Sequence, residues 1–218
     1  MQLDFASYSN IFFDCDGVLL NSNSIKTQAF RNVALRFSED VAERFVAYHV
    51  ANGGVSRYEK FEYLRSEISG TCPDVFELHD LLDDFAKFVE KGLMNAELAQ
   101  GLEELKKASN AKWYVVSGGD QKELRKVFRD RKLDTLFNGG IWGSPETKYE
   151  IIEKLSLEQS IKGRPLFLGD SLLDYEVAEH FGFDFCFISD WSEFKGGKEF
   201  FAKKSRPVVG KLADLLVV

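Results

Sequence analysis

The spacing of apolar residues along the chain changes character near residue 24 and again near residue 92. A short aromatic-rich run from Tyr8 to Phe13 ends at the carboxylates Asp14 and Asp16, which is typical of a buried strand followed by a tight turn. From Ser24 to Glu90 apolar residues recur every three or four positions, the period of an amphipathic helix. This pattern includes Ile25, Ala29, Val33, Phe37, Val75, Leu78, Leu82, Phe85 and Val89. The sequence therefore predicts one strand followed by a helical block.

Beyond residue 92, short apolar runs alternate with helical patterns. We expect strands at 113–116, 140–142, 165–168 and 183–188, and helices at 98–107, 121–131, 145–157 and 172–180. Such alternation predicts βαβ units, and hence a parallel sheet with helices on both faces. The helical block interrupts this series after its first strand, so we interpret it as an insertion. The expected architecture is an α/β core with a parallel sheet over 1–20 and 92–218 and an inserted all-helical cap over 21–91. Residues 195–198 are expected to form a surface loop.

Composition and charge narrow the classes of function. The chain has 218 residues, of which 44% are hydrophobic and 29% charged, the balance of a folded globular protein. Its net charge is −7 and its basic residues are scattered, which disfavours nucleic acid as a partner. The apolar runs are far shorter than a membrane span, so we expect no membrane partner and a cytoplasmic location. Cys15, Cys72 and Cys186 lie too far apart to form a zinc site or a disulfide framework, which favours a reducing compartment. The oligomeric state is not indicated.

Polar residues follow four of the predicted strands. In open parallel sheets the ligand lies beyond the carboxyl ends of the strands, so these residues are the first candidates for a site. They are Asp14-Cys-Asp16-Gly, Ser117-Gly-Gly, Ser144-Pro-Glu-Thr-Lys148 and Gly169-Asp170-Ser-Leu-Leu-Asp174. Carboxylates crowded into one cleft destabilise each other unless a cation binds them, and a hard, oxygen-preferring ion such as Mg²⁺ would fit.

Each of these segments also has a purely structural explanation. Asp-Gly is a common turn dipeptide, and Ser171 with Asp174 matches a capping box at a helix start. The capping box leaves Asp170 unexplained, which favours a role in binding a metal. If Ser144 is an N-cap and Pro145 the first helical residue, Lys148 lies in the first turn, where the helix dipole disfavours a cation. An anion is therefore expected near Lys148.

A serine hydrolase fits the sequence poorly. Ser117 lacks a GxSxG setting, and the three histidines fall in helical stretches with no evident partner. We interpret His49, His79 and His180 as structural. The two glycines after Ser117 instead expose backbone N–H groups at the start of the next helix, which suits an anion, and Asp120 with Glu123 is expected to cap that helix.

Taken in order, the DxDGV motif, the strand-end serine, the lysine near a helix start and GDSxxD resemble the haloacid dehalogenase superfamily, in particular its phosphatase branch with a helical cap. The resemblance spans nearly the whole chain and implies the superfamily's Rossmann-like core. It implies that Asp14 is the nucleophile and Asp16 the general acid and base, with Ser117 and Lys148 as catalytic groups. Ser117, Gly118 and Lys148 would hold the phosphate. The implied Mg²⁺ site consists of Asp14, Asp16, Asp170 and Asp174.

The leading hypothesis is an Mg²⁺-dependent phosphomonoesterase that hydrolyses a small phosphorylated metabolite, such as a sugar phosphate or nucleotide, through an aspartyl-phosphate. Dehalogenation is disfavoured because dehalogenases typically lack the second aspartate. A phosphomutase is an alternative, since Gly54-Val-Ser-Arg57 resembles the cap segment of β-phosphoglucomutase whose arginine grips a distal phosphate. Lys26, however, occupies the position of that enzyme's cap histidine. A non-catalytic phosphate-binding module is disfavoured by Asp16. Specificity is expected to lie in the cap, with Lys26, Arg57, Tyr58 and Lys60 as candidates.

Overall fold

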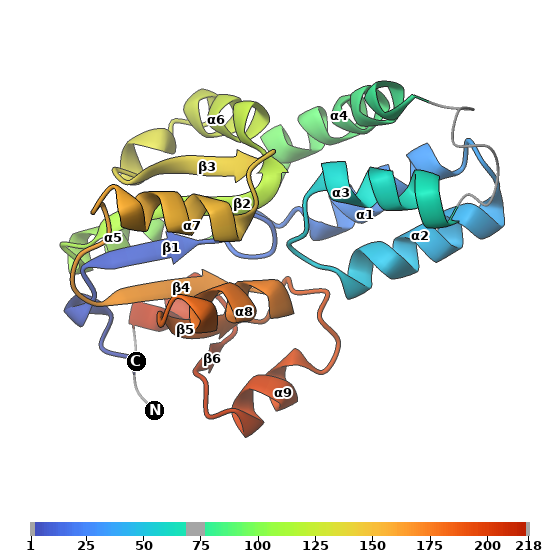
Figure 1. Cartoon of the computed structure of the whole chain (residues 1–218). Helices are drawn as coiled ribbons and strands as arrows, with labels where there is room; N and C mark the ends of the chain where they lie inside the picture. Colours follow the sequence, from blue (N-terminus) through green and yellow to red (C-terminus); the bar gives the residue numbers. More distant parts are fainter. Residues whose placement is uncertain (1–2, 69–76, 217–218) are drawn as a thin grey trace.

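The core of the protein is a parallel sheet (Figure 1). The computed structural model describes residues 3–68 and 77–216. In these residues six parallel strands form one sheet in the order β3-β2-β1-β4-β5-β6. The strands are β1 (Asn10–Phe13), β2 (Lys112–Asp120), β3 (Gly140–Ser144), β4 (Pro165–Gly169), β5 (Asp184–Ile188) and β6 (Val208–Val209). The predicted strands are confirmed, and β6 is an edge strand that the apolar pattern did not indicate. The strand order reverses at β1, so the β1 end lies at the point where such sheets bind ligands.

Helices pack on both faces of the sheet, as the alternating pattern predicts. Alternation along β1 directs Ile11 and Phe13 to one apolar cluster and Phe12 to the other. The first face is covered by α5 (Leu102–Ala108) and α6 (Gln121–Asp130). The second is covered by α7 (Lys148–Leu157), α8 (Leu172–His180) and α9 (Gly197–Lys203). Both faces are apolar, which holds the strand ends in fixed positions beside one another.

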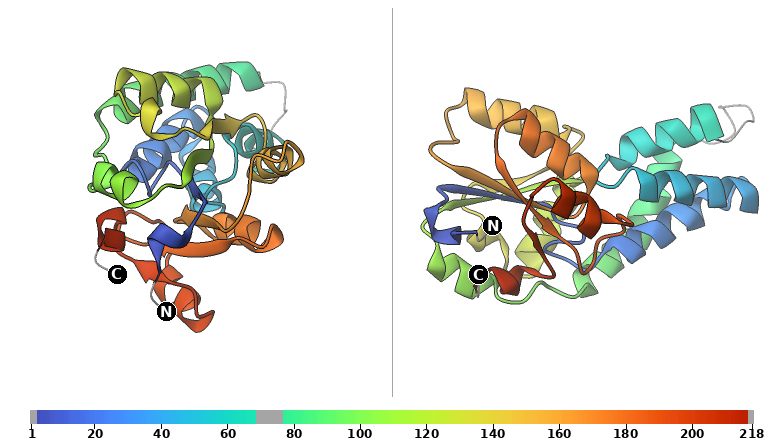
Figure 2. Two further views of the ribbon diagram at one scale, coloured as in Figure 1. Left: turned by 90° about the vertical axis from the view of Figure 1, so that its left-hand side faces the viewer. Right: turned by 90° about the horizontal axis from the view of Figure 1, so that it is seen from below.

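The predicted helical block forms the cap beyond the carboxyl ends of the strands (Figure 2, right). It contains α1 (Asn23–Ala34), α2 (Glu39–Ala51), α3 (Arg57–Tyr63), the π-helical turn η2 (Leu64–Ile68) and α4 (Leu78–Asn95). Its interior is aromatic: the rings of Phe30, Phe45, Phe61 and Phe85 contact one another at centroid distances of 4.3–5.6 Å. Helix α4 continues past the boundary expected at residue 91, and Gly92 lies so close to Ile25 that an added Cβ would meet its Cγ2 at 2.4 Å. The aromatic interior of the cap belongs to the same apolar cluster as the first face of the sheet.

The two segments that join the cap to the core lie side by side. The backbone N–H of Asn21 donates to the carbonyl of Glu97 at 2.9 Å, and that of Ala99 donates to Leu19 at 2.9 Å. Leu20 and Leu98 form an antiparallel bridge between these hydrogen bonds. The chain therefore leaves the core and returns to it at one place.

The start of α7 differs from the prediction. The N-cap is Thr147 rather than Ser144, and Lys148 rather than Pro145 is the first helical residue. The Thr147 side chain accepts from the backbone of Glu150, whose carboxylate accepts in turn from Thr147, so a reciprocal capping box fixes the start. Lys148 still lies in the first turn, where the helix dipole disfavours its positive charge.

The expected loop at 195–198 is partly helical. Gly196, in the left-handed region at φ 77°, precedes α9, which begins at Gly197. Phe201 of α9 is fully buried beside Phe185 and Phe187 of β5. The aromatic pair Phe200-Phe201, which follows this segment, supplies enough apolar surface to pack a short helix on the sheet.

Cys15 and Cys186 are both free and buried, and Cys72 lies outside the described residues. In the described part of the chain, no helix combines the length and the apolar character needed to cross a membrane.

Candidate active site

Three buried carboxylates meet at the carboxyl edge of the sheet. Asp14 follows β1 directly, Asp170 follows β4, and Asp174 lies in the first turn of α8. One oxygen of each lies within 4.8 Å of the others, and their exposed fractions are only 3%, 6% and 0%. The sequence prediction that the carboxylates after β1 and β4 lie together is confirmed for these three residues.

Lys148 is buried against this cluster. Its Nζ lies 3.0 Å from Oδ1 of Asp14 and also pairs with Asp174. Burial favours the neutral amine, but the two carboxylates outweigh it and raise the pKa of Lys148. The anion expected near this lysine is therefore present, and it offsets the unfavourable position at a helix N-terminus.

Asp174 both caps a helix and belongs to the cluster. Its Oδ2 accepts hydrogen bonds from the backbone N–H of Asp170 and Ser171, at 3.2 and 3.1 Å, and from Ser171 Oγ at 2.7 Å. Its Oδ1 accepts from Lys148. The capping box predicted from the sequence is confirmed, and the same carboxylate orients Lys148.

The cluster has the chemistry of a cation site. Burial is the main factor that raises the pKa of Asp14, to about 7, with Lys148 opposing and the negative charges of Asp174 and Asp16 adding to it. Burial, followed by the charges of Asp14 and Asp174, also raises the pKa of Asp170 well above its usual value. Oδ2 of Asp170 accepts from Asn23 Nδ2 at 2.8 Å. Hard carboxylate oxygens this close suit a divalent cation such as Mg²⁺, because its charge would favour the ionised form of each acid.

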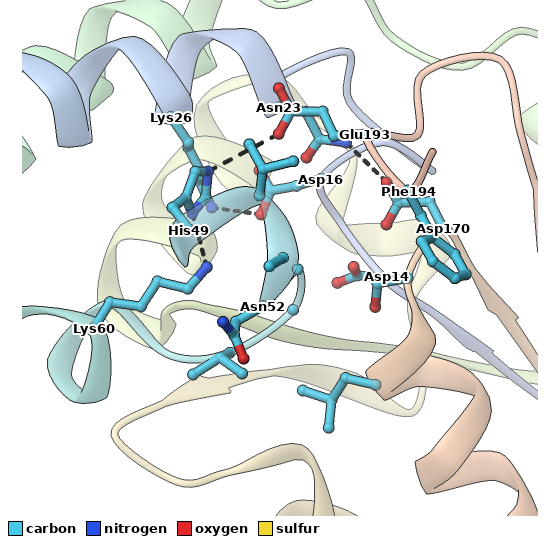
Figure 3. A pocket seen from close by; sticks show the side chains of 18 of the residues that line it. Asp14, Asp16, Asn23, Lys26, His49, Asn52, Lys60, Asp170, Glu193 and Phe194 are labelled. Carbon is cyan, nitrogen blue, oxygen red and sulfur yellow. Dashed lines mark hydrogen bonds and ion pairs between the residues drawn. The ribbon is translucent and has the colours of Figure 1, made fainter. Parts of the chain in front are cut away.

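Asp16 faces the cap rather than the cluster (Figure 3). Its Oδ2 pairs with Lys26 of α1, and its Oδ1 accepts from Ser22 Oγ at 2.6 Å. Burial alone would raise the pKa of Asp16, but Lys26 and Ser22 overcome burial and lower it. Of the four carboxylates assigned to the metal by resemblance, Asp16 is therefore the one that lies outside the cluster of Asp14, Asp170 and Asp174.

Ser117 lies inside β2, fully buried, and its Oγ accepts from the backbone N–H of Gly119 at 3.0 Å. Gly118 lies against the cap: an added Cβ would be 2.3 Å from the carbonyl oxygen of Gly54. Asp120 caps α6 by accepting from the backbone of Glu123, as predicted. The absence of side chains at 118 and 119 lets the cap approach this strand end.

Polar side chains of helix α3 in the cap pair with carboxylates at the start of α6 in the core. Arg57 pairs with Glu123 through both terminal nitrogens, at 3.2 and 2.6 Å, and its guanidinium lies 4.6 Å from the centre of the Phe85 ring. The hydroxyl of Tyr58 donates to Asp120 at 2.8 Å. Arg57, expected to bind substrate, therefore has its charge matched by a core carboxylate in this arrangement.

His49 and Lys60 form a buried polar chain that sequence reasoning did not anticipate. Lys60 Nζ lies 2.8 Å from His49 Nδ1, and His49 Nε2 lies 3.0 Å from Thr27 Oγ1. The Thr27 hydroxyl donates to both oxygens of Glu193, each at 3.0 Å. His49 lies in a helix as predicted, but it has partners and lines a cavity. The pair joins α2 to α3 across a turn, so no periodicity within one helix could indicate it.

A cavity of about 290 Å³ lies between the cap and the core, and Figure 3 shows part of its lining. Asp14, Asp16 and Asp170 line its core side, while Lys26, His49, Arg57 and Lys60 line its cap side. Ser117, Lys148 and Asp174 lie behind this lining, where they contact its members. The sequence-predicted residues are thus gathered around one cavity.

This fold and this acidic cavity define a capped α/β enzyme. Residues 8–182 match the family model of haloacid dehalogenase-like hydrolases, so the chain belongs to that family, as its motifs predict.

Solved structures share the fold. A haloacid dehalogenase-like family protein from Streptococcus pneumoniae is 20% identical, with a TM-score of 0.67 over 97% of this chain and 98% of that one. A protein from Haemophilus somnus described as a predicted phosphoglycolate phosphatase is 19% identical, with a TM-score of 0.72 over 96% and 97%. The β-phosphoglucomutase of Clostridium difficile is 14% identical, with a TM-score of 0.71 over 95% and 92%. At these identities the likeness concerns the fold alone. No curated protein matches the chain.

Proposed function

We propose that this protein is an Mg²⁺-dependent phosphomonoesterase that hydrolyses a small phosphorylated metabolite through an aspartyl-phosphate on Asp14. The observation that carries the proposal is the position of Asp14, which lines the cavity with Lys148 Nζ 3.0 Å from its Oδ1 and Asp170 in the same acidic cluster. The structural neighbour described as a predicted phosphoglycolate phosphatase supports this class of reaction.

Asp14 supplies the nucleophile. Its carboxylate oxygen forms a bond to phosphorus as the bond from phosphorus to the leaving oxygen breaks, which splits one difficult displacement into two easier ones. Lys148, the hydroxyl of Ser117 and the backbone N–H of Gly118 are assigned to the phosphoryl oxygens, where positive charge and donors stabilise the transition state. Asp14, Asp170 and Asp174 would hold Mg²⁺, which when bound neutralises further charge on the phosphoryl group.

Asp16 serves as the acid and then the base. It gives its proton to the leaving oxygen and recovers a proton from the water that attacks the aspartyl-phosphate. Because Lys26 keeps Asp16 ionised in the arrangement described above, we expect Asp16 to gain a proton only when the substrate displaces Lys26. The cap would then close over the reacting groups and exclude water.

Release of inorganic phosphate tests the proposal. The assay compares wild type with Asp14→Asn and with the control Asp134→Asn, which changes an exposed carboxylate of the core. Each protein is incubated with sugar phosphates, nucleotides, phosphorylated hydroxy acids and an aryl phosphate, in the presence of either Mg²⁺ or EDTA. We expect release by wild type and by the control that requires Mg²⁺, and a loss of about 10³-fold or more in Asp14→Asn. Absence of release from every ester, with all three proteins folded, would refute the proposal.

The same incubations separate the phosphomutase alternative. Conversion of β-glucose 1-phosphate to glucose 6-phosphate, without release of phosphate, would identify a mutase. The ion pair between Arg57 and Glu123 disfavours that outcome, because the arginine assigned to a second phosphate already has a carboxylate partner.

A further inference from the structure

Lys60 differs from the other buried cations of the protein. In residues 3–68 and 77–216, four lysine or arginine side chains are buried. Three of them have a carboxylate partner within 4.0 Å: Lys26 pairs with Asp16, Arg57 with Glu123, and Lys148 with Asp14 and Asp174. Lys60 is only 2% exposed, yet its one hydrogen bond in the described residues goes to a histidine. A buried ammonium without a matching anion is costly, so its position calls for an explanation.

The direction of the hydrogen bonds fixes what Lys60 can offer. The Glu193 carboxylate is an acceptor, so the Thr27 hydroxyl donates to it and accepts from His49 Nε2–H. Nδ1 of His49 then carries no proton and accepts from Lys60. Burial and the charge of Lys60 lower the pKa of His49 to about 2, which keeps the ring neutral. Lys60 therefore uses one N–H on a neutral partner, and its Nζ also lies 5.4 Å from the centre of the Phe30 ring. Two of its N–H groups have no hydrogen-bond acceptor among the described residues.

The two remaining N–H donors of Lys60 are on a side chain that lines the cavity. Lys60 enters the cavity from α3, on the cap side, while Asp14 lines the opposite, core side. Burial, with the neighbouring charge of Lys26, lowers the pKa of Lys60 to about 7, and an anion bound beside it would raise that pKa again. The geometry is that of a second anion site facing the phosphate site across a small cavity.

We propose, on the basis of the phosphomonoesterase function above, that Lys60 binds a carboxylate carried by the leaving group, so that the substrates are compact phosphate esters of hydroxy acids. One ammonium matches the single charge of a carboxylate, whereas a second phosphate would require a further cation. The other two cations on the cap side of the cavity, Lys26 and Arg57, already pair with Asp16 and Glu123 in this structure. A cavity of about 290 Å³ lies at the small end of ligand sites, which favours a leaving group of a few carbons.

Matched substrates test this inference. Wild-type kcat/KM is measured for 2-phosphoglycolate against its uncharged amide, and for 3-phosphoglycerate against glycerol 3-phosphate. A three-carbon bisphosphate tests the second-phosphate alternative. We expect the carboxylate ester of at least one pair to be preferred by about 30-fold or more, mainly through KM, because a buried charged contact is lost in the neutral partner. Equal rates within both pairs, or a preference for the bisphosphate, would overturn the inference.

Lys60→Met replaces the ammonium with an apolar chain of similar length. It is expected to reduce the preference to about threefold or less, whereas the control Lys91→Met, at an exposed position of the cap, retains it. An equal loss on charged and neutral esters in Lys60→Met would contradict a role in recognition. Thermal unfolding establishes that each variant is folded.

Calorimetric binding to Asp14→Asn separates this inference from the proposed function. Suppose that wild type hydrolyses no ester, but Asp14→Asn binds the carboxylate esters more tightly than the neutral ones and loses this preference when Lys60→Met is added. The phosphatase proposal then fails and the anion site stands. If phosphate is released without any preference that depends on Lys60, the reverse holds.

Discussion

Acidification is expected to destabilise this protein through His49. The ring lies in α2 between Lys60 of α3 and Thr27 of α1, and Lys26 also faces it. Its pKa is lowered to about 2, chiefly by burial and then by the two ammonium groups, whereas a histidine in an unfolded chain has a pKa of about 6.5. Between these values the unfolded chain binds one more proton than the folded protein, so the free energy of unfolding falls as the pH falls below 6.5.

The size of this effect follows from the two pKa values. One proton changes the free energy of unfolding by about 1.4 kcal/mol per pH unit, so the step from pH 6.0 to pH 4.5 costs the folded state about 2 kcal/mol through His49. Both values lie below the pKa of Lys60, about 7, so this lysine is mainly charged in the wild type throughout the step.

Urea unfolding of wild type and His49→Gln at the two pH values, followed by circular dichroism, measures this contribution. Acidic residues titrate in both proteins, so the difference between them isolates the imidazole. We expect wild type to lose about 2 kcal/mol relative to His49→Gln over this step. His180→Gln, which removes an exposed imidazole from the end of α8, is the matched control. A difference between wild type and His49→Gln that stays constant within about 0.5 kcal/mol would refute the buried neutral ring.

Two further predictions concern the cap and the acidic cluster. Gly118→Ala places a Cβ 2.3 Å from the carbonyl oxygen of Gly54, so we expect it to hinder the approach of the cap to the core. The value of kcat/KM is expected to fall about tenfold or more, while the thermal unfolding midpoint changes little. An unchanged kcat/KM would mean that this contact is not needed for turnover. Mg²⁺ at about a hundred times its dissociation constant should stabilise the fold by about 2.7 kcal/mol in thermal unfolding, and an equal gain in Asp170→Asn would exclude Asp170 from the metal site.

The strand ends were predictable because their chemistry is local in the sequence. Asp14 and Asp170 each follow an apolar run directly, and the rule that parallel strands end at one edge brings them together. The first residue of α7 was misplaced because Ser144-Pro and Thr147 are both plausible helix starts. The reciprocal bond between Thr147 and Glu150 decides between them only in three dimensions.

The cap side of the site could not be read in the same way. Lys60 and His49 lie on different helices, and Glu193 comes from the core, so their meeting depends on how the cap packs on the sheet. The sequence indicated Arg57 as a candidate for substrate binding, but it indicated its partner Glu123 only as part of the N-terminal capping of α6. Hydrophobic periodicity predicts which face of a helix is apolar, but it does not predict which polar groups of two helices contact each other.

The paired segments at Leu20 and Leu98 have a consequence for how such an enzyme can diversify. The chain leaves the core and returns to it at adjacent positions that are joined by backbone hydrogen bonds. The core is therefore connected to the inserted segment only through these two neighbouring chain ends, whatever lies between them. An exchange of the intervening segment would keep those ends in place and leave the order of the strands untouched. Because Lys26 and Arg57 of the cap pair with Asp16 and Glu123 of the core, a chimera joined at these two residues would keep the catalytic frame of one parent only where the new cap supplies partners for those two carboxylates.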